Sequence, residues 1–178
     1  VFCPKLCRSA CPVSNAEPRE TLTPWGKMSM AYFAANESVE VSASFAKPAW
    51  ACTGCFGCRE HCDHKNDVAG TLFDARSALV GAGEGPPEAK RVLDRFKERA
   101  SVLGNTREDP RVLPFVDGAS RTAVLVGCEH ARGKTDGGVD AVRATSMLLG
   151  TKVAIVDVCC GAPLLYAGDA QRFKQQAE

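Results

Sequence analysis

Four closely spaced cysteines constrain this chain more than any other feature. They follow the pattern C-x2-C-x2-C-x3-C and are Cys52, Cys55, Cys58 and Cys62. Gaps of two residues allow three thiolates of one loop to face a single cubane of iron and sulfide, while the fourth cysteine turns toward a second cluster. The spacing therefore predicts a [4Fe-4S] site in this loop.

Two other uses of these thiolates compete with that interpretation. Zinc accepts mixed cysteine and histidine ligands, and His61 and His64 flank Cys62. A zinc site does not need a third cysteine within six residues of the first, so the spacing favours iron. Disulfides are less favoured still, because ten cysteines in 178 residues are a smaller fraction of cysteine than small secreted scaffolds have.

A second cysteine set lies at the N-terminus, and its last member precedes Pro12. These cysteines are Cys3, Cys7 and Cys11. In the bacterial two-cluster motif the cysteine before proline serves the other cluster, which predicts a crossed pairing. Cluster one would then take Cys11, Cys52, Cys55 and Cys58. Cluster two would take Cys3, Cys7 and Cys62. The sequence does not identify a fourth ligand for cluster two. Cluster two is therefore a [3Fe-4S] cluster, or a second [4Fe-4S] cluster whose fourth ligand lies upstream of Val1 or is not a cysteine.

Charge and hydropathy exclude several classes of function. The net charge is +1 with 24% charged residues, so no strong electrostatic field points to nucleic acid or an anionic surface. The apolar runs are shorter than the roughly 20 residues that cross a bilayer, and no signal peptide is evident. We expect a cytoplasmic protein, with docking at the inner face of the membrane as an open alternative. Because the chain starts at Val1 and stops within a helical run, we expect a fragment of a longer protein.

The first half of the chain predicts an α-helical ferredoxin-like domain over residues 1–104. Thr23 and Pro24 are typical of a helix start, and a helix is expected over Trp25–Ala35. A second helix is expected over Asp67–Val80, directly after the cysteine loop. The stretch Gly81–Pro87 predicts a turn or linker, and a charged helix should follow to Leu103.

The second half predicts the start of an α/β domain over residues 120–178. Two apolar strands, Thr122–Val126 and Lys152–Val158, flank a helix over Val139–Leu149, which predicts a βαβ unit with parallel strands. Cysteines follow each strand, so Cys128, Cys159 and Cys160 should meet at one sheet edge. A buried cysteine is often only a small apolar residue. A Cys-Cys pair before a glycine indicates instead a tight turn that exposes thiols.

Taken together, these motifs resemble a family of iron–sulfur subunits with cysteine-rich "CCG" domains. The family includes the heterodisulfide reductase catalytic subunit, the iron–sulfur subunits of glycolate and lactate oxidation, and that of anaerobic glycerol-3-phosphate dehydrogenase. The motifs that carry the resemblance are Cys3 to Pro12, Cys52 to Cys62, and Cys128-x30-Cys159-Cys160-Gly161-x-Pro163. The resemblance implies an α-helical ferredoxin domain followed by a partial CCG domain, with a further cluster held in part by Cys128, Cys159 and Cys160. The remaining family cysteines would lie beyond Glu178.

The resemblance implies an electron-transfer subunit of an oxidoreductase complex. On one side, it would exchange electrons with a flavoprotein or another oxidoreductase subunit. On the other side, it would pass them to or from the CCG site or a downstream acceptor, and this acceptor could be membrane-bound. No glycine-rich nucleotide loop is evident, so flavin or nicotinamide is expected on a partner. Two alternatives stay open: a catalytic subunit that reduces a disulfide substrate, and a zinc-binding structural module.

Overall fold

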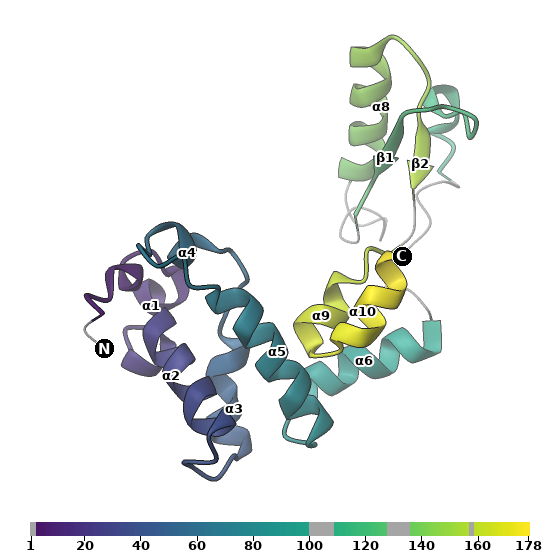
Figure 1. The fold of residues 1–178 in the computed structure, drawn as a ribbon. Helices are drawn as coiled ribbons and strands as arrows, with labels where there is room; N and C mark the ends of the chain where they lie inside the picture. Colours follow the sequence, from purple (N-terminus) through teal and green to yellow (C-terminus); the bar gives the residue numbers. More distant parts are fainter. Residues whose placement is uncertain (1–2, 100–108, 128–135, 157–158) are drawn as a thin grey trace. The chain divides into compact units, whose positions relative to one another are not determined.

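The computed structural model describes residues 3–99, 109–127, 136–156 and 159–178 (Figure 1). The chain forms two compact units. The first comprises Val1–Asp94 and Pro163–Gln175, and the second comprises Arg95–Ala162 and Gln176–Glu178. The expected domains, 1–104 and 120–178, divide the chain differently, because residues 163–175 pack with the N-terminal unit.

The first unit is built from helices joined by short loops. Its elements up to the unit boundary are η1 (Leu6–Arg8), α1 (Pro12–Ala16), η2 (Glu20–Leu22), α2 (Pro24–Ala35), α3 (Ala43–Trp50), α4 (Gly57–Glu60), α5 (Val68–Gly81) and the start of α6 (Pro87–Arg99). The three helices α2, α3 and α5 pack against one another. Their core contains Ala49, Cys58, Val68 and Leu72, so one of the motif cysteines is itself a core residue.

Side-chain caps fix the starts of two of the helices that were predicted in this unit. The Thr23 hydroxyl accepts a hydrogen bond from the backbone N–H of Gly26 at 3.0 Å, and Pro24 occupies the first turn of α2. An Asp67 carboxylate oxygen accepts from the N–H of Gly70 at 3.1 Å at the start of α5. The expected helices are confirmed to within one residue at each end.

Helix α6 begins at Pro87, as expected, and extends to Arg99. The predicted end of this helix at Leu103 lies outside the described residues. The boundary between the two units falls inside α6. Residues 82–86 connect α5 to α6, within the stretch Gly81–Pro87 where a turn or linker was expected.

The second unit contains a parallel pair of strands with a helix between them in sequence. Its elements are η4 (Leu113–Phe115), β1 (Ala123–Leu125), α8 (Gly137–Leu149) and β2 (Ala154–Val156). The strands pair in register with Val124 opposite Ile155, and α8 lies against them (Figure 1). The core consists of Val112, Val126, Val139, Val142, Val153 and Ile155. The parallel strand pair and its intervening helix are confirmed. The expected end of the second strand, at Val158, lies outside the described residues.

Two short helices, α9 (Ala162–Ala167) and α10 (Ala170–Ala177), end the chain. Most of their residues belong to the first unit, although they follow the second unit in sequence. The helical run at the C-terminus was expected, but its return to the N-terminal unit was not. In the described part of the chain, no helix combines the length and the apolar character needed to span a membrane.

Candidate metal centre

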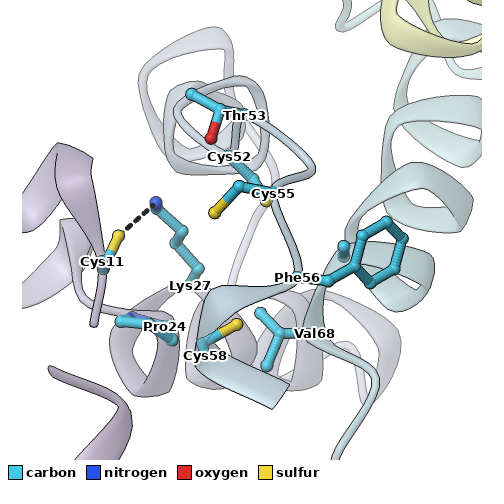
Figure 2. A pocket seen from close by; sticks show the side chains of 10 residues that line it. Cys11, Pro24, Lys27, Cys52, Thr53, Cys55, Phe56, Cys58 and Val68 are labelled. Atoms are coloured by element: carbon cyan, nitrogen blue, oxygen red, sulfur yellow. Dashed lines mark hydrogen bonds between the residues drawn. The ribbon is translucent and has the colours of Figure 1, made fainter. Parts of the chain in front are cut away.

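Four cysteine side chains line one pocket of the first unit (Figure 2). Cys52 and Cys55 come from the loop between α3 and α4, and Cys58 comes from α4. The fourth, Cys11, directly precedes α1 and is distant in sequence. The structure therefore brings together the four side chains that the crossed pairing assigns to cluster one.

The cysteine loop is shaped by residues with positive φ angles. Gly54 has φ 68° and Phe56 has φ 57°. A side chain at Gly54 would not fit, because its Cβ would lie 2.7 Å from the Tyr166 hydroxyl and 3.0 Å from the Phe73 ring. A left-handed Phe56 costs roughly 1–2 kcal/mol, a strain that recurs where a site dictates the backbone path. These conformations direct the three thiols of the loop toward one pocket.

Burial and mutual repulsion shift the pKa of Cys58. Burial raises its pKa most, and the charges of Cys52, Cys7 and Cys55 raise it further, to about 11. Several thiolates therefore share this space only when positive charge accompanies them, as bound metal provides. A cubane takes one thiolate at each of its four irons, so the donor set fits a four-iron cluster.

Lys27 extends from α2 into the same pocket (Figure 2). Its Nζ donates to the Cys11 sulfur at 3.7 Å and to the Ala51 carbonyl oxygen at 3.0 Å. Burial raises the pKa of the Cys11 thiol, but hydrogen bonds from Ser14 and the charge of Lys27 outweigh burial and hold this pKa below 9.0. Lys27 and Ser14 therefore place positive charge and hydrogen-bond donors around Cys11.

The three cysteines expected at cluster two also lie near one another. Burial raises the pKa of Cys7, and the charges of Cys3 and Cys62 raise it further, while a hydrogen bond from the backbone of Trp25 lowers it. Cys7 also packs against the core that contains Cys58, so the two groups of cysteines adjoin. Every other described cysteine of this unit lines the pocket, so none remains as a fourth ligand.

Single-ion sites are not formed by the described residues. Within 3–99, 109–127, 136–156 and 159–178, no three histidine, cysteine, aspartate or glutamate side chains converge as ligands of one metal ion. Ligands of a cubane bind at separate corners and need not converge on one point.

Arg76 is a buried arginine that hydrogen-bonds to the backbone of the cysteine loop. Its role was not predicted from the sequence. Arg76 is only 1% exposed. Its guanidinium donates to the carbonyl oxygens of Ala49 at 3.0 Å, Cys52 at 2.5 Å and Tyr166 at 3.3 Å. One signal was present in the sequence: Arg76 continues the i, i+4 spacing of Val68 and Leu72 and therefore falls on the buried face of α5.

The CCG cysteines are only partly described. Cys128 lies outside the described residues, so the expected meeting of three cysteines stays a prediction. Cys159 is buried, and its carbonyl oxygen accepts from Gln176 Nε2 at 3.1 Å, whereas Cys160 is exposed. Gly161 has φ 75°, which fits the tight turn expected after the pair.

Comparison with known proteins agrees with the geometry of the N-terminal unit. The family model of the 4Fe-4S dicluster domain matches residues 1–66, which include all seven cysteines of the two groups. This match supports an iron–sulfur protein of the ferredoxin type that binds 4Fe-4S clusters, and it suggests electron transfer. Neither a curated protein nor a solved structure matches the chain.

Proposed function

We propose that this protein is an iron–sulfur electron-transfer subunit of an oxidoreductase complex. One observation carries the proposal. Four cysteines from two distant segments line a single pocket, within the stretch that matches a dicluster domain. When bound there, the clusters would supply one-electron transfer.

The cysteine positions support two proposed ligand sets. Cluster one, a [4Fe-4S] cluster, takes Cys11, Cys52, Cys55 and Cys58. Cluster two takes Cys3, Cys7 and Cys62 and is a [3Fe-4S] cluster, or a [4Fe-4S] cluster whose fourth ligand lies outside the seven cysteines of the two groups. The adjoining positions of the two groups support electron exchange between them.

The remaining residues of the pocket hold the ligands and keep water out. Val68 and Ala69 form part of its apolar lining and are buried. Arg76 fixes the backbone of Cys52 through its carbonyl oxygen. The Lys27 ammonium group donates a hydrogen bond to the Cys11 sulfur. Hydrogen bonds to ligand sulfurs and burial are the means by which a protein sets a cluster's reduction potential.

The partner is a flavoprotein or another subunit of an oxidoreductase. Cys55 is exposed and Phe56 is 42% exposed, so the loop of cluster one reaches the surface, where a partner can approach. A membrane-bound protein is a further candidate acceptor. Cys128, Cys159 and Cys160 are the proposed beginning of a CCG site, to which a further cluster would bind with ligands contributed from elsewhere.

Metal analysis of the anaerobically purified protein tests the proposal. Iron, zinc and acid-labile sulfide are measured, and EPR spectra are recorded before and after reduction. About seven or eight irons per chain with equal sulfide are expected from two clusters, and an EPR signal in the oxidised protein would identify a three-iron cluster two. Zinc without sulfide would contradict electron transfer and support a structural zinc module.

A further inference from the structure

Lys27 is a lysine that is buried in the first unit. Its side chain belongs to the fourth residue of α2, and Lys27 is 2% exposed. Across the described parts of the chain, it makes no ion pair with a carboxylate. The two groups that its Nζ contacts are the Ala51 carbonyl oxygen and the Cys11 sulfur.

A buried ammonium group is costly unless a charge of opposite sign lies beside it. The Ala51 carbonyl oxygen satisfies one donor of the ammonium group but carries no net charge. The remaining groups of opposite sign in this pocket are the thiolates of the proposed ligands. Four thiolates around a four-iron core carry a net negative charge, which grows when the core accepts an electron. The negative charge of the cluster and its thiolates would compensate the positive charge of the Lys27 ammonium group.

The N-terminus of α2 holds this lysine in place. Thr23 caps the helix, and Gly26 packs so closely against the Glu20 carbonyl oxygen that a Cβ would collide with it. Since Lys27 follows Gly26 directly, the cap and this close packing fix the backbone of Lys27 at the start of α2. The contacts with Cys11 and Ala51 then hold its Nζ.

We propose that Lys27 is the charge-compensating residue of cluster one: it stabilises the reduced state of that cluster and raises its reduction potential. This inference rests on the proposed function, because it requires a cluster at Cys11, Cys52, Cys55 and Cys58. The electron that reduces the cluster comes from the partner in the complex, or from dithionite in the test, and no bond forms or breaks. Lys27 acts through the Cys11 sulfur and is therefore a positioning residue.

The test compares reduction midpoints by EPR-monitored titration of the whole chain with its clusters. Lys27→Met removes the charge at nearly constant side-chain length, and Lys27→Arg retains it. Lys47→Met is the matched control. Lys47 is an exposed lysine on α3, so this substitution removes the same charge from a site that faces solvent.

We expect one of the two midpoints to fall in Lys27→Met. At the wild-type midpoint, the ratio of reduced to oxidised cluster one should drop about tenfold, which corresponds to about 59 mV for a one-electron couple. Lys27→Arg should restore most of this ratio, and Lys47→Met should leave both midpoints unchanged. Unchanged midpoints in a cluster-loaded Lys27→Met protein would overturn the inference and leave Lys27 a structural role only.

A measurement on the wild-type sequence decides the matter if Lys27→Met fails to hold cluster one. Protein labelled with ¹⁵N-lysine is reduced and examined by pulsed EPR. A lysine nitrogen coupled to the cluster spin is expected, and its absence would overturn the inference. Wild-type protein without iron and sulfide would instead show that the proposed function itself is wrong.

Discussion

The hydroxyl of Tyr166 donates a hydrogen bond to the carbonyl oxygen of Thr53 at 3.0 Å, across 113 positions of sequence. Thr53 lies between two cysteines of the loop, and Tyr166 lies in α9, shortly after the Cys159–Cys160 pair. The Tyr166 ring also packs edge-on against Phe73, with 5.2 Å between ring centroids. A segment from the C-terminal end of the chain therefore supports the cysteine loop of the N-terminal unit.

Removing the hydroxyl of Tyr166 should loosen the loop. Tyr166→Phe keeps the ring contact with Phe73 and loses one hydrogen bond, which costs about 0.5–1.5 kcal/mol. We expect faster loss of iron to a chelator and a correspondingly lower unfolding free energy under anaerobic conditions. The control is Tyr32→Phe, because Tyr32 is 62% exposed and its ring contacts Phe33 rather than the loop. Equal rates of iron loss in the two variants would contradict this role for Tyr166.

Replacing Arg76 should be more damaging, because its guanidinium serves three backbone carbonyl oxygens at once. Arg76→Met fills similar space but leaves these buried acceptors without their donor, at a cost of about 2–4 kcal/mol. Arg91→Met is the matched control, since Arg91 is exposed and its surface ion pair with Glu88 contributes about 0–1 kcal/mol. Thermal unfolding of both holo-proteins measures the difference. Similar stability of the two variants would show that Arg76 does not support the loop.

Alanine substitutions at two glycines distinguish the cost of a strained backbone from the cost of a steric clash. Gly54 and Gly83 both have positive φ, but a Cβ at Gly83 would meet no atom within 4 Å. Gly83→Ala should lose roughly 1–2 kcal/mol from strain alone. Gly54→Ala should lose about 1–3 kcal/mol more, because its Cβ meets the Tyr166 hydroxyl and the Phe73 ring. Iron content should fall only in Gly54→Ala; a normal iron content there would mean that the loop can shift without losing its cluster.

Local patterns in the sequence predicted much of the fold, because the relevant interactions span a few residues. Thr23 and Asp67 bond backbone N–H groups three positions on, and such caps are visible in the sequence. The segment Asn36–Pro48 gave no clear prediction and contributes most of α3, which Ser42 caps. A proline within the helix obscures the signal there.

The cysteines of the site were identifiable from their spacing, but the residues around them were not. Lys27 resembles any surface lysine until Cys11 and Ala51 are seen to surround it. Arg76 contacts carbonyl oxygens up to 90 residues away, which no local pattern encodes. Long-range contacts of this kind arise from how the helices pack, and packing is what the sequence alone does not reveal.

The crossed ligand assignment is tested most directly by comparing Cys11→Ser with Cys7→Ser and Cys55→Ser. Each variant is purified anaerobically and reduced, and its EPR spectrum, iron and sulfide are measured. The structure predicts that Cys11→Ser alters the same cluster signal as Cys55→Ser, because both side chains line one pocket. Cys7→Ser should alter the other signal. If Cys11→Ser instead alters the signal that Cys7→Ser alters, the ligand assignment is wrong.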